Sequence, residues 1–477
     1  MFSPEAMLCF VLAASLAAAP APRAATATET LVHIPRMDAI QGLTAFLERA
    51  GQPSAMLRPD VWFAELHPFL SIDPRQPDTF TRAGIDPATP LTLSVLASGR
   101  ISCTRLADPK LFQERAAAML LSANPKVTEV KPTTSAGLTS VLVPRESGGD
   151  IGYALKGKEA CAFASEGGGF VDDGQGKVLF KEASRLVSQA PKADARMGKL
   201  PGTLYVSIPK RGLTVGLDGS ATALQVEGTG TNLPLPAFQS SGTSPYGTMM
   251  PSGLLFSRAR LTPAGVSDVM DNVRSIIQRI CPDCPKAEVT SITRSVSGRL
   301  TGNVLTVVDG VRPRPNLRTP EGRFFAPRQA LVAEMTDPAA VKSALAPLAK
   351  FPGVRVLEDG YALDVKGGTL ILHIRGRHLA LGNDETVASS LLSVVPAQGA
   401  KLPHAVTFTV DPARVASGLK QVSLMDVISD KRLAGIFTVG LELGPLLTQS
   451  KDIEGWLDSL PGGGHRFSSR WTLPATP

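Results

Sequence analysis

Short apolar runs that end at an acidic or hydroxyl residue followed by proline recur along the chain, and an amphipathic stretch with helical spacing follows each of them. The acidic or hydroxyl side chain can accept hydrogen bonds from the free amides of a first helical turn, and the fixed φ of proline suits the first helical position. The pattern therefore predicts four strand-to-helix junctions, at Asp108-Pro109, Thr262-Pro263, Asp337-Pro338 and Asp411-Pro412.

Two hairpins are predicted where apolar strands flank a basic-Gly-basic turn. The first turn is Lys156-Gly157-Lys158 and the second is Arg375-Gly376-Arg377. Glycine supplies the positive φ that such a tight turn needs. Each hairpin follows a proline-started helix in the same order, which indicates repeated modules.

These elements predict an α+β fold of repeated strand-helix-strand-hairpin modules with mainly antiparallel sheets, preceded by a short helical segment. A segment rich in Ser, Gly, Pro and Thr is expected to be a long exposed loop or lid, and its few large side chains include Tyr246, Met249 and Met250. The predicted divisions are a signal peptide (1–27), a helical entry segment (28–90), a first module (91–200), a second module (201–308) with that loop insert (229–253), a Pro/Arg linker (309–327), and third and fourth modules (328–477).

The first residues are typical of an export signal. The apolar run over 7–19 is too short to span a bilayer but suits a signal-peptide core, and small residues follow it up to Ala27. No later apolar stretch is long enough to cross a membrane. We therefore expect a periplasmic or secreted protein that does not span the membrane.

Cysteine usage agrees with export. Once Cys9 leaves with the signal, the even set Cys103, Cys161, Cys281 and Cys284 fits two disulfides in an oxidising compartment. Three pairings are possible. The short spacing of the last two cysteines favours a local bridge, which leaves the first two to close a long loop that would contribute about 4 kcal/mol.

The Cys281-Pro282-Asp283-Cys284 motif has the spacing of a thiol-disulfide enzyme. In such enzymes the pair opens a helix, where the helix dipole lowers the pKa of the thiol. Here the motif closes the helix predicted over Pro263–Ile280, so we favour a structural bridge over a redox centre.

The net charge of +7 lies mostly in the middle of the chain, where residues 201–320 hold 12 basic and 7 acidic side chains. A basic face there could contact an anionic envelope surface, and the alternative is a solvated surface with an arginine-rich linker. The arginines that we predict for such a contact are Arg258, Arg260, Arg312, Arg314 and Arg318.

No sequence motif indicates catalysis. The chain has no Gly-x-Ser-x-Gly elbow, no complete phosphate loop and no dinucleotide fingerprint, and its six histidines are scattered. We therefore predict no catalytic, cofactor-binding or metal-binding residues and no nucleic-acid partner. The expected function is that of a non-enzymatic envelope or extracellular scaffold or binding protein. The alternatives are a periplasmic carrier of lipid or another apolar ligand, and an exported hydrolase or thiol-disulfide enzyme.

The combination of an export signal, proline-started helices and basic-Gly-basic hairpins resembles exported bacterial proteins of unknown function that contain duplicated α+β modules. The resemblance extends from residue 91 to the C-terminus. It implies a periplasmic or secreted protein without established catalysis, and it transfers no functional residues to this chain.

Overall fold

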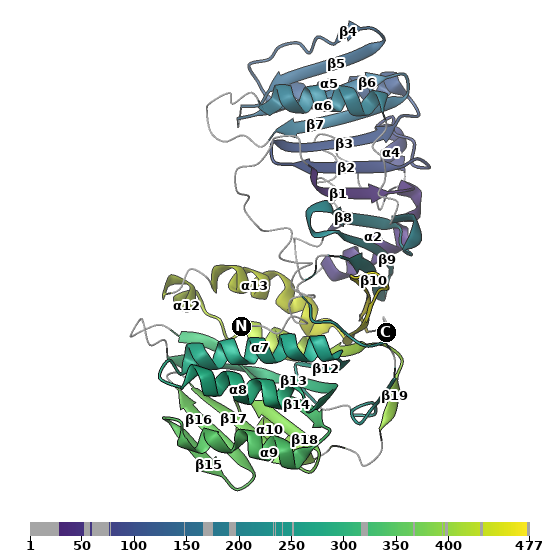
Figure 1. The fold of residues 1–477 in the computed structure, drawn as a ribbon. Coiled ribbons are helices and arrows are strands. Elements are labelled where there is room, and N and C mark those ends of the chain that lie inside the picture. Colours follow the sequence, from purple (N-terminus) through teal and green to yellow (C-terminus); the bar gives the residue numbers. More distant parts are fainter. Residues whose placement is uncertain are drawn as a thin grey trace. The chain divides into compact units, whose positions relative to one another are not determined.

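The chain is seen in a computed structural model that divides into two compact units, Ala13–Leu233 and Pro234–Thr476, which we call the N-terminal and C-terminal units (Figure 1). The signal-peptide prediction for 1–27 lies outside the described residues. The structure describes residues 28–51, 58–59, 76, 78–146, 148–165, 175–189, 197–231, 233, 235–240, 242–249, 252–315, 323–365, 368–393, 395, 399–429 and 433–474.

The N-terminal unit is an antiparallel sheet with helices on both faces. Its strands pair in the order β4-β5-β6-β7-β3-β2-β1-β8-β9-β10. The strands are β1 (Thr28–Ile34), β2 (Leu91–Leu96), β3 (Gly99–Arg105), β4 (Thr133–Ser135), β5 (Leu138–Pro144), β6 (Asp150–Lys156), β7 (Glu159–Ser165), β8 (Leu204–Ile208), β9 (Leu213–Ser220) and β10 (Ala223–Gly230).

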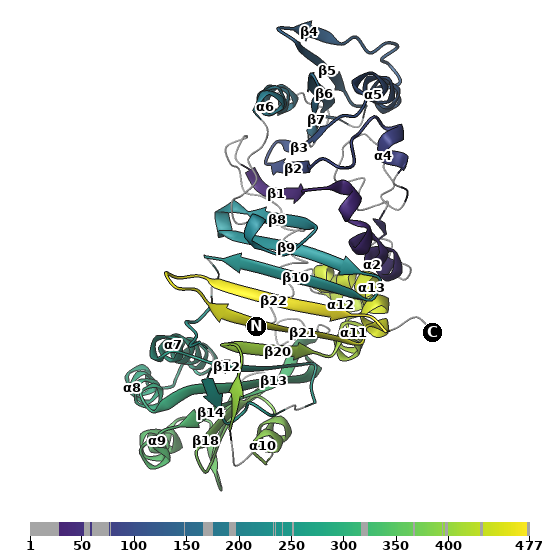
Figure 2. The same ribbon diagram turned by 90° about the vertical axis from the view of Figure 1, so that its right-hand side faces the viewer.

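Helices α5 and α6 cover opposite faces of this sheet (Figure 2). The side chains of α5 pack with Tyr153 and Leu155, whereas those of α6 pack with Phe163 and Ala154, because neighbouring strand residues point to opposite faces. The helices are η1 (Met37–Ala39), α2 (Gln41–Gly51), α4 (Asp78–Arg82), α5 (Pro109–Ala123), α6 (Gln175–Ser188), η3 (Met197–Lys199) and η4 (Pro209–Arg211).

The C-terminal unit has its own antiparallel sheet in the order β15-β16-β17-β18-β14-β13-β12-β20-β21-β22, and β11 pairs separately with β19. Its strands are β11 (Gly242–Ser244), β12 (Leu255–Arg260), β13 (Leu300–Pro315), β14 (Arg323–Met335), β15 (Val354–Leu357), β16 (Gly360–Val365), β17 (Gly368–Arg375), β18 (His378–Gly382), β19 (Ala400–Leu402), β20 (Val406–Val410), β21 (Asp452–Ser459) and β22 (His465–Thr472). Its helices are α7 (Pro263–Ile280), α8 (Lys286–Ser297), α9 (Pro338–Leu345), η5 (Ala346–Lys350), α10 (Glu385–Ser393), α11 (Pro412–Leu419), α12 (Leu424–Ser429) and α13 (Ala434–Gln449).

The prediction of an α+β fold with antiparallel sheets is confirmed, whereas the repeat of four modules is not. The two strand orders match position by position, so that β3, β6 and β7 take the places of β14, β17 and β18. The similarity of topology therefore relates two whole units. The predicted boundary between 200 and 201 falls inside the N-terminal unit, because β8 pairs with β1 through Val32 and Val206.

All four proline-started helices form as the sequence predicts. The Asp108 carboxylate accepts from the amides of Lys110 and Leu111, and the other three cap side chains accept from Gly265, Ala340 and Arg414. Both predicted hairpins also form, with Gly157 and Gly376 at φ values of 61° and 56°. These features depend only on neighbouring residues.

Two predicted segments have a different structure. The entry segment (28–90) is not purely helical, because β1 is a strand that pairs with both β2 and β8. The predicted linker (309–327) is strand wherever it is described, since β13 and β14 extend into it and pair with each other. We call residues 310–315 and 323–328 the arm; its prolines are tolerated because these residues lie beyond the stretches that pair with β12 and β18.

Both predicted disulfides are present. Cys103 and Cys161 face each other on β3 and β7 with their Cα atoms 4.1 Å apart. Cys281 is the C-cap of α7, and its bridge to Cys284 closes the turn before α8. The disulfides are compatible with an exported protein.

Candidate ligand-binding site

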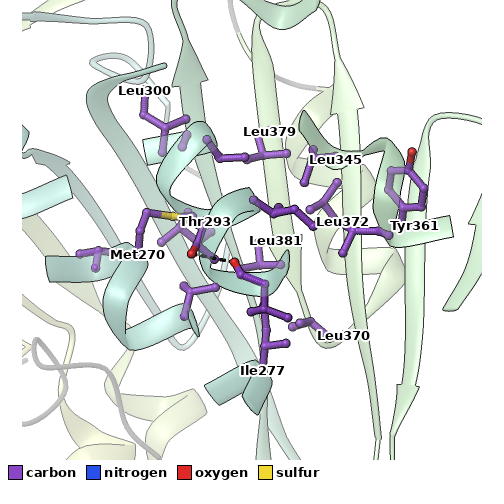
Figure 3. A pocket seen from close by; sticks show the side chains of 18 of the residues that line it. Met270, Ile277, Thr293, Leu300, Leu345, Tyr361, Leu370, Leu372, Leu379 and Leu381 are labelled. Atoms are coloured by element: carbon purple, nitrogen blue, oxygen red, sulfur yellow. Dashed lines mark hydrogen bonds between the residues drawn. The ribbon is translucent and has the colours of Figure 1, made fainter. Parts of the chain in front are cut away.

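A cavity of about 120 Å³ lies in the C-terminal unit, between one face of the sheet and the helices α7, α8 and α9 (Figure 3). The sheet contributes Leu300, Gly302, Val304, Leu331, Ala333, Val354, Tyr361, Leu363, Leu370, Leu372, Leu379 and Leu381. The remaining lining residues are Leu261, Val266, Val269, Met270, Val273, Ile277, Val289, Ile292, Thr293, Val296, Leu345, Leu348 and Phe351.

The strand pattern explains how the sheet lines this cavity. Successive strand residues point to opposite faces, so every second residue reaches the same side. Leu372 stands opposite Tyr361, and Leu370 stands opposite Leu363, in the register of β17 with β16. The cavity floor is therefore a continuous set of cross-strand apolar pairs.

The apolar stripe of α7 forms the opposite wall. Val266, Met270, Val273 and Ile277 recur at helical spacing and all line the cavity. Val266 is buried, but the other three remain partly exposed. A helix that packs tightly on a sheet covers such a stripe completely, so α7 leaves apolar surface that a ligand could cover.

The chemistry of the cavity is almost entirely apolar. Of the described residues that line it, none is charged, and only Thr293 and Tyr361 bear hydroxyl groups. The Thr293 hydroxyl is already used within α8, where it donates to the Val289 carbonyl oxygen at 2.9 Å. The volume is close to that of an engineered apolar cavity of about 150 Å³ that binds benzene. The cavity can hold an apolar group but presents no acid, base or nucleophile to it.

The predicted basic face is not one set of free arginines. Arg258 Nη1 donates to the Gly247 carbonyl oxygen at 2.7 Å, and its Nε donates to Thr407 Oγ1 at 3.1 Å. Arg260 Nη1 donates to the Ser240 carbonyl oxygen at 2.7 Å. Both side chains thus hold the segment that precedes β12, and burial lowers the pKa of Arg258.

The other three predicted arginines belong to the extended β13–β14 hairpin. Arg312 is exposed, and Arg314 stands opposite Phe324 in the strand register. Arg318 lies outside the described residues. Of the five predicted arginines, Arg312 is therefore the one whose side chain the structure describes as exposed on the arm.

The predicted loop insert is anchored in the core by its large side chains where the structure describes it. Tyr246 is fully buried and Met249 nearly so, and both join the core formed with α10. The Tyr246 hydroxyl lies 3.1 Å from His378 Nδ1. Met250 lies outside the described residues. Because Gly242–Ser244 pairs with β19 and the large side chains pack, the described part of this segment does not support a role as a mobile cover.

The Tyr246–His378 contact predicts a pH dependence of stability. Burial is the main cause that lowers the pKa of His378. The charge of Glu334 raises this pKa, and the charge of Arg377 lowers it. The folded protein favours the neutral imidazole. Its contribution to the free energy of unfolding is therefore present above the unfolded pKa of about 6.5, and it is lost as the pH falls through the lower folded pKa. We expect His378→Gln to keep a partner for Tyr246 and to weaken the loss of stability between pH 7.5 and pH 5 in urea titrations. Equal losses in both proteins would contradict this assignment.

Two further histidines pair with carboxylates, although His373 Nε2 is buried without a hydrogen-bond partner. His373 Nδ1 lies 2.6 Å from Asp359, and His404 Nδ1 lies 2.8 Å from Asp458. Within the described residues, no group of three or more His, Cys, Asp or Glu side chains could hold a metal ion. Both cysteines of the Cys281–Cys284 bridge are buried in the core beside α8.

Sequence reasoning found one wall of the cavity and missed the rest. The apolar stripe of α7 is evident from its spacing, whereas no helix was predicted where α8 lies. The signal for α8 is the spacing of Val289, Ile292 and Val296, which are all buried.

Comparisons with known proteins add little. No family model matches the chain, and no curated protein matches it. A solved structure titled "Structure of crystal form I of TP0453" is similar to this chain at 10% identity over 78% of this chain and 95% of that chain, with a TM-score of 0.20. A likeness at that score carries no argument. Among the described helices, none is both long and apolar enough to cross a membrane.

Proposed function

We propose that this protein is an exported, non-enzymatic binding protein that carries an apolar ligand, such as an acyl chain, in the cavity of its C-terminal unit. The observation that supports the proposal is the cavity itself, whose described walls are apolar on both the sheet side and the helix side. A catalytic site needs positioned polar groups, and the described lining of this cavity offers only the hydroxyls of Thr293 and Tyr361. We do not favour a thiol enzyme, because Cys281 and Cys284 are both buried.

The affinity would come from the area removed from water. Each methylene buried contributes about 0.8 kcal/mol, so a chain segment of about six methylenes would gain about 5 kcal/mol before the cost of ordering it. With no charged lining residue described, the cavity selects for shape and apolarity. A polar headgroup would remain outside.

Filling the cavity tests the proposal. Leu372 lines the cavity. The equivalent residue in the N-terminal unit is Tyr153, because each lies four positions before the glycine of its hairpin turn, Gly376 and Gly157 respectively. Tyr153 is fully buried, so the topology accepts an aromatic ring at this place. We expect Leu372→Phe to weaken binding of a dansyl-labelled undecanoic acid at least about tenfold, measured by fluorescence titration.

The matched control is Val356→Phe. Val356 lies on β15 of the same unit, is 64% exposed and does not line the cavity, so this variant should bind like the wild type. The proposal fails if Leu372→Phe and the wild type bind the probe equally. It fails also if the wild type binds no apolar probe and its native mass spectrum, taken after purification from its own envelope, shows no bound apolar molecule.

A further inference from the structure

Most of the strongly exposed apolar side chains among the described residues lie on two helices that contact each other, α12 and α13. Within the described residues, five large hydrophobic side chains are more than half exposed, and four of them lie on α12 and α13 of the C-terminal unit. They are Leu424 (59%), Met425 (67%), Ile428 (65%) and Leu441 (62%). Single exposed apolar residues are ordinary, but a cluster of them marks an interaction surface.

The outward direction of the α12 apolar side chains is fixed by a capping box. Ser423 Oγ and the Ser423 amide both donate to Asp426 Oδ2, at 2.6 and 2.8 Å, and the Asp426 amide donates back to Ser423 Oγ at 3.3 Å. Asp426 is only 4% exposed. It is the single charged residue of α12, so the helix turns its carboxylate inward and leaves Leu424 and Ile428 in solvent.

The basic arm begins beside the helix that leads into α12. Arg414 Nη1 donates to Asp309 at 3.2 Å, and a Cβ placed on Gly418 would lie 3.4 Å from Val311. Helix α11 therefore runs along β13 at the base of the arm. Arg312 and Arg314 follow directly on β13, and the arm segments 310–315 and 323–328 contain no acidic residue.

We propose that α12, α13 and the arm together form a docking surface for an anionic lipid bilayer. Leucine and isoleucine side chains would enter the headgroup boundary while the arginines contact lipid phosphates, which is the combination used by interfacial helices. A second copy of the chain fits less well, because a twofold contact would place two patches of the same positive charge against each other. The inference does not depend on whether the cavity is occupied.

Vesicle co-sedimentation tests this surface. The full mature chain is mixed with phosphatidylcholine vesicles that contain or lack phosphatidylglycerol. We expect binding to the anionic vesicles, a loss of more than about tenfold in the partition coefficient for Leu424→Ser/Ile428→Ser, and a loss of about fivefold or more for Arg312→Glu. At high salt the partition coefficients of Arg312→Glu and the wild type should become equal, whereas Leu424→Ser/Ile428→Ser should still bind more weakly than the wild type.

Two matched controls come from the same unit. Val356→Ser removes an equally exposed apolar side chain on β15, and Lys342→Glu reverses an exposed charge on α9. Both should bind vesicles like the wild type. Equal loss in the controls and the test variants, or no preference for anionic vesicles, would overturn the proposal. The proposal would also be overturned if light scattering showed a dimer that Leu424→Ser/Ile428→Ser dissociates while vesicle binding stays unchanged. The surface would then join two copies of the chain.

Discussion

Replacing Cys103 and Cys161 together by alanine should lower the free energy of unfolding of the N-terminal unit by about 4 kcal/mol. The bridge spans a sequence separation of 58 residues, so its loss frees a long loop in the unfolded chain. It also joins two directly opposed residues of β3 and β7 near the middle of the strand order. Urea unfolding without reductant, followed by a probe for each unit, should show the shift in one transition only, since units with separate cores unfold separately.

The second disulfide is the internal control for this result. Cys281 and Cys284 lie only three positions apart in the sequence, so the same chain-entropy argument gives about 2 kcal/mol for their double replacement. That smaller loss should appear in the transition of the C-terminal unit. If the two double variants lost equal stability, or if both shifted the same transition, loop closure would not be the source of the effect.

The features that the sequence predicts correctly are those set by neighbouring residues. The cap at Asp337 needs only the amide of Ala340, and the turn at Gly376 needs only its own positive φ. Strand pairing is different. Val32 pairs with Leu93 on one side and with Val206 on the other, and nothing near Val32 in the sequence indicates either partner. For this reason β1 was expected to be part of a helical segment, and two large units were expected to be four small modules.

The candidate site also combines features that the sequence predicts with features that depend on distant residues. The stripe of α7 is visible in the sequence, but whether it packs without a gap depends on side chains from β13 through β18 that meet only in the folded unit. The outward face of α12 is equally hidden, because the apolar pattern of Leu424 and Ile428 predicts burial. In the structure the buried side chain of this helix is instead Asp426, which is hydrogen-bonded to Ser423.

The matching strand orders allow the two cores to be compared residue by residue. Phe112 and Val341 each lie four residues after the aspartate that caps α5 or α9, and both are fully buried. Phe112 meets Tyr153 edge to face, with ring centroids 5.5 Å apart and planes at 79°. In the C-terminal unit the equivalent pair is Val341 and Leu372, and Leu372 borders the cavity. An aromatic contact in one unit thus corresponds to an aliphatic position beside open space in the other.

Phe112→Ala should therefore destabilise the N-terminal unit by about 4 kcal/mol, through the lost burial, the cavity left behind and the lost ring contact with Tyr153. Val341→Ala, at the equivalent position, removes only two methyl groups and should cost about 2 kcal/mol in the C-terminal unit. Urea titration with a separate probe for each unit measures both. Because each residue belongs to the core of its own unit, each variant should move a different transition. A Phe112→Ala variant that lost no more stability than Val341→Ala would show that the N-terminal core collapses around the missing ring, and the aromatic pair would then not be what fills that unit.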